Sequence, residues 1–240
     1  MKHIGILGHS AEGAGLCFQT IVREAAECLG EQNHPVITMN IRAMGPMMPL
    51  WEGFELSELS EIFHSSLESL ERSGADFFIC PDNTAHLAIA AMEADFPIPG
   101  IHIVDVVQNE MIRNNFRSAG LLGTKWTMTS DLYKRSQEDG GPAILIPEQA
   151  ERDYVNSAIF NELCNGQFKA DTRSRFTDII QTLKNDGADC VILGCTEIPL
   201  LIEQADSPLP ILDSTRLLAR SAIAHAIGVG KRNGSLRQRF

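Results

Sequence analysis

Short apolar segments alternate along the chain with segments in which apolar residues recur at helical spacing. Residues 3–7, 36–41 and 77–80 are apolar runs of strand length. Between them, residues 18–29 and 56–70 each keep one helical face apolar. Because parallel strands need crossover connections that a helix usually supplies, this alternation predicts an α/β fold with parallel sheet and helices on both faces.

The same pattern occurs twice, at a spacing of roughly 110 residues. Gly5 aligns with Gly120 inside matching apolar runs, the triplet Gly74-Ala75-Asp76 aligns with Gly187-Ala188-Asp189, and Ile103-Val104-Asp105 aligns with Ile211-Leu212-Asp213. We therefore expect two pseudo-symmetric open parallel-sheet βα domains, with the active site in the cleft between them. Their expected bounds are 1–105 plus 213–228 for one half and 106–212 for the other, with 229–240 as a basic, disordered tail.

Reactive side chains follow equivalent strands in the two halves. Ligands of open α/β sheets bind beyond the carboxyl ends of the strands. When the two Gly-Ala-Asp triplets are aligned, Asp82 corresponds to Cys195 and Asn83 to Thr196, each just past a strand. The pairing predicts that Asp82 and Cys195 face each other across a cleft.

Simpler interpretations exist for both segments. Asp82, Asn83 or Thr84 also fits the role of a helix cap, and Cys195 also fits that of a small buried thiol. The glycine-rich start of the chain matches neither the dinucleotide nor the P-loop pattern. It is either a turn whose backbone amides hold a carboxylate or a tight βα turn without a ligand.

Composition narrows the class of partner. Of the 240 residues, 44% are hydrophobic, enough for a sizeable core, and the formal charge of −11 disfavours nucleic acid and anionic membrane surfaces. A small solute is the expected partner. The chain shows neither a signal-peptide core nor an apolar run of about 18 residues, so we expect a cytoplasmic protein. The six cysteines form no C-x-x-C pair and the seven histidines are scattered, so we expect free thiols and no metal.

Two segments resemble the signatures of a known family. Asp82-Asn83-Thr84-Ala85-His86 and Leu193-Gly194-Cys195-Thr196-Glu197-Ile198-Pro199 are similar to those of the aspartate/glutamate racemase superfamily, and the likeness extends over most of residues 1–228. The resemblance implies two α/β halves that hold one cysteine each. One thiolate removes the α-proton of an amino acid and the opposite thiol reprotonates the other face, without pyridoxal phosphate or another cofactor. It also implies a homodimer.

The first signature departs from the family where the chemistry takes place. Pro81-Asp82-Asn83-Thr84 stands where the family usually has Pro-Cys-Asn-Thr, and Cys80 lies too deep on its strand to substitute. Reference pKa values of about 3.9 and 8.5 make an aspartate the weaker base by about 6 kcal/mol. Burial can raise a carboxyl pKa by up to about 3 to 5 units. We therefore expect either a racemase with unequal rates in its two directions or a relative that uses Cys195 alone.

The resemblance also assigns substrate-binding residues. Asn83, Thr84 and Thr196 are expected to bind the α-carboxylate, with Glu197 in the same set. Lys169 is a candidate cation for a side-chain carboxylate, although an ordinary surface lysine fits it equally well, and Arg42 is a second candidate.

The first loop also differs from the family in length. Ser10 is expected to face the substrate from the loop Gly8-His9-Ser10, which has one residue fewer than the family's Gly-Gly-Met-Ser.

Three functions fit these residues. The leading one is cofactor-independent racemisation or epimerisation of an acidic or other small amino acid by two-base proton transfer between Cys195 and Asp82. A decarboxylase, lyase or isomerase of a small dicarboxylate would need only Cys195 as proton carrier. A non-catalytic amino-acid sensor would keep the binding groups without the chemistry.

Overall fold

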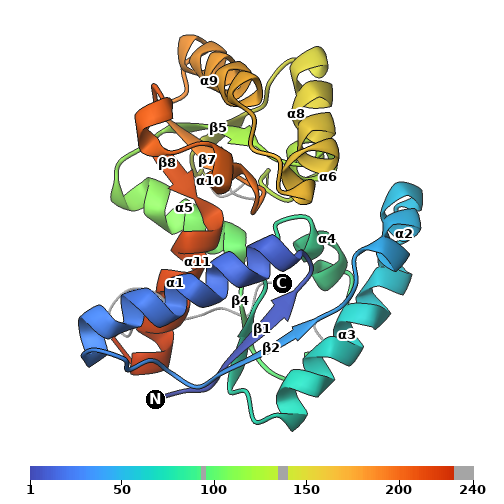
Figure 1. The fold of residues 1–240 in the computed structure, drawn as a ribbon, viewed down its shortest axis with the longest axis vertical. Coiled ribbons are helices and arrows are strands. Elements are labelled where there is room, and N and C mark those ends of the chain that lie inside the picture. Colours follow the sequence, from blue (N-terminus) through green and yellow to red (C-terminus); the bar gives the residue numbers. More distant parts are fainter. Residues whose placement is uncertain (93–95, 135–139, 230–240) are drawn as a thin grey trace. The chain divides into compact units, whose positions relative to one another are not determined.

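The computed structural model describes residues 1–92, 96–134 and 140–229 (Figure 1). The chain divides into two compact units. The first half comprises Met1–Ile103 together with Thr215–Phe240, and the second half comprises Val104–Ser214. Residues 230–240, which make up nearly all of the predicted tail, lie outside the described residues. None of the helices in the described ranges is long and apolar enough to cross a membrane.

The first half is built on a parallel sheet with strand order β2-β1-β3-β4. Its strands are β1 (Ile4–Gly8), β2 (Ile37–Ile41), β3 (Phe77–Ile79) and β4 (Gly100–Ile101). Its helices are α1 (Ala11–Leu29), α2 (Met48–Gly53), α3 (Leu56–Arg72), α4 (Ala85–Ala90) and α11 (Ser214–Ile227). Because right-handed crossovers run outward through α1 and back through α3, these two helices cover opposite faces of the sheet.

The second half repeats the plan with strand order β6-β5-β7-β8, again all parallel. Its strands are β5 (Ser118–Leu122), β6 (Ala143–Leu145), β7 (Cys190–Leu193) and β8 (Ile211–Asp213). Its helices are α5 (Ile103–Arg113), α6 (Lys125–Thr129), α8 (Gln149–Asn161), α9 (Ala170–Asn185) and α10 (Ile198–Leu201). The predicted fold class, α/β with two open parallel sheets, is confirmed.

The two Gly-Ala-Asp triplets have the same role in both halves: each ends a helix and leads into the third strand. Gly74 and Gly187 have positive φ angles of 83° and 101°, which end α3 and α9 in a conformation that favours glycine. The carboxylate of Asp76 then accepts the amide of His3 at 2.6 Å, as that of Asp189 accepts the amide of Arg117 at 2.8 Å. Each aspartate thus ties the start of the third strand to the start of the first.

One of the three predicted sequence matches is wrong. Residues 103–105 begin helix α5, whereas 211–213 form strand β8. The true counterpart of β8 is β4, because Phe78 donates its amide to the Pro99 carbonyl at 2.8 Å as Val191 does to Pro210 at 2.9 Å. The sequence match failed because β4 is only two residues long and carries no apolar run.

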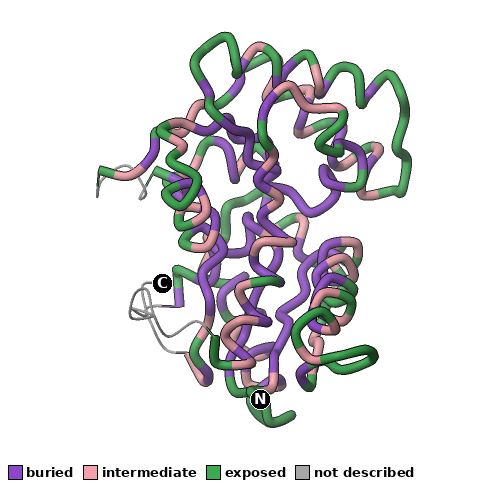
Figure 2. The backbone as a smooth tube through the Cα atoms, turned by 90° about the vertical axis from the view of Figure 1, so that its left-hand side faces the viewer, coloured by how far each residue is buried: buried purple, intermediate pink, exposed green. Residues whose placement is uncertain are grey.

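Each sheet is the core of its half. Strands β1, β3 and β7 are buried throughout, and the tube in Figure 2 is purple mainly in the interior and green mainly at the outer turns. Strands buried on both faces read as continuous apolar runs, and Phe77, Phe78 and Ile79 are at most 1% exposed. The helices pack closely on the strands: a Cβ at Gly120 would lie 2.8 Å from Cδ1 of Leu183.

Candidate active site

The Asp82 segment occupies the carboxyl edge of the first half's sheet. Residues 80–84 connect β3 to α4, and Asn83 and Thr84 are buried while Asp82 is half-buried. Ile6 pairs with Ile79 in the parallel ladder, so the residues after β1 and those after β3 leave the sheet at the same level. The Ser10 loop and the Asp82 loop are therefore neighbours on one edge.

Asp82 takes part in a capping interaction. Its Oδ1 accepts the backbone amide of Ala85, the first residue of α4, at 3.2 Å. Its other oxygen, Oδ2, accepts no hydrogen bond in the described part of the chain. A carboxylate offers about four acceptor positions on two oxygens. The cap thus orients the group and leaves Oδ2 for other chemistry.

Two buried, uncharged side chains lie near Asp82, those of Cys80 and His86. Burial, reinforced by the nearby charge of Asp82, holds the pKa of the Cys80 thiol well above its usual value, so this thiol keeps its proton. His86 Nε2 lies 3.0 Å from the Cys80 carbonyl and must donate, because a carbonyl only accepts. Burial lowers the pKa of His86 to about 4. A thiol that keeps its proton is a poor base.

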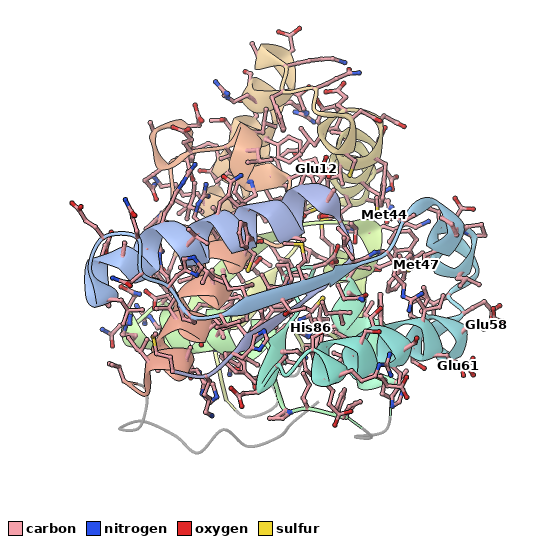
Figure 3. The ribbon with its side chains drawn as sticks, turned by 60° about the horizontal axis from the view of Figure 1, so that its bottom comes forward. Glu12, Met44, Met47, Glu58, Glu61 and His86 are labelled. Atoms are coloured by element: carbon pink, nitrogen blue, oxygen red, sulfur yellow. The ribbon has the colours of Figure 1, made fainter. Side chains whose placement is uncertain are left out.

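Ser10 begins the long helix α1. Its hydroxyl accepts the amide of Gly13 at 3.1 Å, which is an ordinary N-cap, and its side chain is buried. Glu12 lies in the first turn of the same helix (Figure 3), where a negative charge complements the helix dipole. The second half has the matching cap in Thr124, which accepts the amide of Thr127 at 3.2 Å before α6.

Cys195 occupies the corresponding edge of the second half. It follows β7 after one glycine, whose amide donates to the Leu122 carbonyl at 2.7 Å. A Cβ on Gly194 would lie 3.0 Å from both Leu121 Cδ1 and Leu122 O, so only glycine fits without displacing the neighbouring strand. Cys195 is 8% exposed.

Glu197 lies against the Cys195 thiol. The Sγ of Cys195 is 2.9 Å from Oε2 of Glu197, and the Thr196 hydroxyl donates to the same oxygen at 2.8 Å. Glu197 is 2% exposed. A carboxylate at hydrogen-bond distance can take the thiol's proton and return it. The oxygen Oε2 thus contacts the Cys195 thiol, and the substrate-binding role of Glu197 stays an expectation from the sequence.

The two candidate cations have protein partners. Lys169 precedes α9 and forms an ion pair with Glu162 at 2.9 Å. The hydrogen bond from Thr172 lowers the pKa of Glu162 most, and the hydrogen bond from Lys169 lowers it further. Lys169 and Glu162 thus form a partly exposed polar pair at the start of α9.

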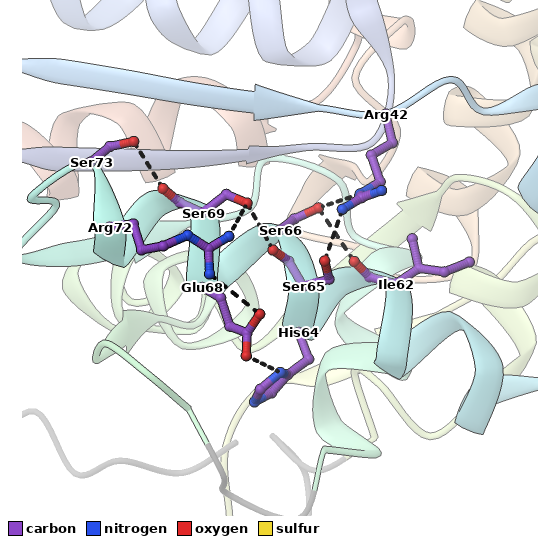
Figure 4. A network of polar contacts seen from close by, with 9 residues as sticks. All are labelled: Arg42, Ile62, His64, Ser65, Ser66, Glu68, Ser69, Arg72 and Ser73. Atoms are coloured by element: carbon purple, nitrogen blue, oxygen red, sulfur yellow. Dashed lines mark hydrogen bonds and ion pairs between the residues drawn. The ribbon is translucent and has the colours of Figure 1, made fainter.

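Arg42 follows β2 and donates from Nε to Ser66 at 2.8 Å and from Nη2 to Ser65 at 3.0 Å, on α3 (Figure 4). It also lines an open cavity of about 480 Å³ together with Leu50, Glu58, Glu61, Ile62 and Ser65.

Seven of the eight predicted site residues fall into two groups, and the eighth, Lys169, lies at the start of α9. Four lie on the carboxyl edge of the first half, namely Ser10, Asp82, Asn83 and Thr84, and three lie on that of the second half, namely Cys195, Thr196 and Glu197. Among the described residues, no cluster of three or more His, Cys, Asp or Glu side chains could hold a metal ion. Sequence reasoning gave no role to two buried histidines, His86 in the Asp82 segment and His9 in the loop Gly8-His9-Ser10.

Comparison with known proteins gives the family. A model described as Asp/Glu/hydantoin racemase matches residues 6–222. The broad specificity amino-acid racemase RacX of Bacillus subtilis is 26% identical over 170 residues, 70% of this chain and 72% of the relative.

Solved structures agree with that match. An aspartate racemase homologue from Pyrococcus horikoshii is 30% identical with a TM-score of 0.80 over 95% of this chain and all of its own. A candidate Asp/Glu racemase from Yersinia pestis gives a TM-score of 0.85 at 26% identity, over 95% of this chain and all of its own. The named relatives are racemases, which are isomerases, and this confirms the resemblance and the enzyme class expected from it. The chain belongs to the Asp/Glu/hydantoin racemase family.

Proposed function

We propose that the protein is a cofactor-independent racemase or epimerase of an acidic or other small amino acid, with Cys195 and Asp82 as its two proton carriers. One observation carries the proposal: both residues follow the third strand of their sheet, β7 and β3, in two halves of identical strand order. Family membership supports the reaction type. The names of the relatives, RacX and the aspartate racemase homologue, support an amino-acid substrate.

In one direction of the reaction, Cys195 acts as the base in its thiolate form. Glu197 Oε2 accepts the Cys195 proton, and the resulting thiolate removes the α-hydrogen of the substrate as a proton. The carbanion then takes a proton from a protonated Asp82 on its other face. In the reverse direction the Asp82 carboxylate removes the α-proton and the Cys195 thiol reprotonates the carbon. Because a carboxylate is intrinsically a weaker base than a thiolate, kcat differs between the two directions, whereas kcat/KM is equal for two enantiomers of equal free energy.

Substrate binding uses the remaining residues of the two edges. We propose that Asn83, Thr84 and Thr196 bind the α-carboxylate, with Ser10 beside them. A second carboxylate on the substrate would bind Lys169 or Arg42. Either cation must then exchange a present partner, Glu162 for Lys169 or the two α3 serines for Arg42.

A second candidate follows from the cap. The hydrogen bond from Ala85 to Asp82 suits a residue that only orders its helix. In that case Cys195 would be the sole proton carrier, as in a decarboxylase, lyase or isomerase of a small dicarboxylate. Such an enzyme would exchange or deliver one proton without inverting an amino acid.

Solvent exchange distinguishes these functions. The purified protein is incubated in deuterated water with each enantiomer of aspartate, glutamate, alanine and serine, and proton NMR follows the α-hydrogen while polarimetry follows inversion. A racemase incorporates deuterium with loss of optical activity, and Cys195→Ser abolishes inversion together with the α-hydrogen exchange that the thiol carries. Cys28→Ser, at an exposed thiol, is the matched control and keeps them. Binding without α-hydrogen exchange for any substrate would contradict the proposal and favour a sensor.

The family resemblance supports a homodimer, and the cytoplasmic location stays an expectation from the sequence. Multi-angle light scattering of the purified protein tests the first, and fractionation of the source cells tests the second.

A further inference from the structure

His9 carries a buried ring nitrogen, Nδ1, that has no hydrogen-bond partner among the described residues. His9 lies between β1 and α1 and is 4% exposed. The indole Nε1 of Trp51 lies 2.8 Å from His9 Nε2, and the two rings stack at a centroid distance of 5.5 Å. Phe63 packs edge-on against the same imidazole, also at 5.5 Å. The ring is thus held in one orientation by two aromatic side chains.

The contact with Trp51 fixes the tautomer. An indole N–H can only donate, so Nε2 of His9 must accept and the ring proton lies on Nδ1. Nδ1 is buried and makes no hydrogen bond within the described residues. A buried N–H without an acceptor is costly, and native structures usually pair such groups. The first loop therefore contains a preoriented donor that still needs an oxygen.

The position of His9 indicates where that oxygen comes from. The loop leaves the sheet level with the Asp82 segment, because Ile6 pairs with Ile79. In the second half the corresponding loop passes from Gly123 directly to the cap Thr124, whereas the first half has His9 between Gly8 and the cap Ser10. His9 is thus an extra residue that breaks the repeat at the proposed site.

A racemase needs equivalent groups on the two faces of the substrate's α-carbon, but it needs no such pair around the substrate's side chain. The α-carbon must meet equivalent groups from both halves, and the chain supplies them in pairs: Asp82 with Cys195, and Ser10 with Thr124. The side chain of the substrate does not need equivalent groups from both halves. A residue that occurs in only one half is therefore suited to the side chain.

We propose that His9 determines substrate specificity, with its Nδ1–H donating to an oxygen acceptor on the substrate's side chain, either a carboxylate or a carboxamide. The proposal rests on the amino-acid substrate of the proposed function. Trp51 is a positioning residue, since it acts on the substrate only through the tautomer of His9. Glu12 and Asp82 lie on the same edge, and their negative charge would repel a carboxylate. A substrate with a carboxamide side chain is therefore a real alternative to one with a carboxylate.

NMR of protein labelled with ¹⁵N-histidine tests the donor independently of catalysis. The His9 signals are assigned by their loss in His9→Phe, which keeps an aromatic ring against Trp51 and Phe63. We expect a protonated Nδ1 and an unprotonated Nε2, and a shift of the Nδ1 signal on addition of aspartate or asparagine but not of alanine. Trp51→Phe, which removes the indole donor and leaves a smaller aromatic ring, should allow the His9 proton to move to Nε2. Trp126→Phe is the matched control and should not.

Binding measured by calorimetry gives the second readout. His9→Phe should weaken binding of aspartate or asparagine about tenfold or more and leave alanine within about twofold, since one hydrogen bond to the side chain is lost. A proton on Nε2, or an Nδ1 signal that no amino acid moves, overturns the proposal. The proposed racemisation fails separately: absence of α-hydrogen exchange with a responding Nδ1 signal leaves His9 as a binding residue in a sensor.

Discussion

The Sγ of Cys195 lies 2.9 Å from Oε2 of Glu197, two residues further along the chain. The same oxygen accepts a hydrogen bond from the Thr196 hydroxyl, and at position 194, just before these residues, a Cβ would lie only 3.0 Å from Leu122 O. A thiol and a carboxylate thus share one hydrogen bond at the carboxyl end of β7. Under the proposed function, Glu197 is the proton acceptor that Cys195 needs to act as a base.

Glu197→Gln should lower kcat for racemisation by about 100-fold, because positioned acid–base groups contribute about 10² to 10⁴. Glutamine keeps a hydrogen-bonding group near the thiol but takes up no proton at neutral pH. The α-hydrogen exchange rate in deuterated water is the measurement, and Glu31→Gln at an exposed turn is the control. An unchanged rate in Glu197→Gln would mean that the thiol passes its proton to another group.

His86 should make the protein acid-sensitive. Its pKa is about 4 in the folded protein, because of burial, and about 6.5 when unfolded. The unfolded state therefore binds more protons between these values, and stability falls as the pH is lowered through that window. The loss attributable to His86 between pH 7 and pH 5 is about 2 kcal/mol.

Urea unfolding of the wild type and of His86→Gln at both pH values measures this loss. Glutamine can donate to the Cys80 carbonyl but does not titrate, so the variant should show a shallower pH dependence. His225, whose pKa burial also lowers, contributes equally to both proteins. The exposed His34→Gln serves as control and should keep the wild-type slope. Equal slopes in the wild type and His86→Gln would contradict a lowered His86 pKa.

Gly120→Ala should destabilise the second half by about 1 to 3 kcal/mol through overpacking against Leu183. Gly15→Ala in α1 has open space around the added methyl group and should stabilise by about 0.5 to 1 kcal/mol. Thermal unfolding measures both. In a double variant with Leu183→Ala the two costs should be less than additive, because the clash is removed. Additive costs would show that the helix does not press on the strand there.

The sequence was sufficient for the elements whose signal is local. Strands β1, β2 and β3 and helices α1 and α3 follow from apolar spacing, and the two Gly-Ala-Asp triplets disclose the repeat because each glycine must adopt a positive φ angle. Strand β4 carried no such signal, since two residues are held in the sheet by pairing with β3 alone. The repeat was therefore misaligned at its last segment.

The sequence was enough to place the candidate site residues, but not to predict which groups they contact. Residue types placed Asp82 and Cys195 at equivalent strand ends. The turn geometry decided that Asp82 Oδ1 accepts the amide of Ala85 and that Glu197 contacts the thiol. The contact between His9 and Trp51 spans 42 residues and depends on how α2 packs. No local pattern predicts such a contact.

Asp82→Asn tests the two-carrier mechanism most directly. Asparagine can still accept the Ala85 amide through its side-chain oxygen, but it cannot carry the proton, whereas Asp82→Ala removes both functions and should also cost about 1 kcal/mol of stability. The measurement is deuterium incorporation and inversion for each enantiomer of the best substrate. The mechanism predicts that Asp82→Asn abolishes inversion while Cys195 still exchanges the α-hydrogen of one enantiomer only. Inversion by Asp82→Asn at the wild-type rate would show that Asp82 is a helix cap and not a proton carrier.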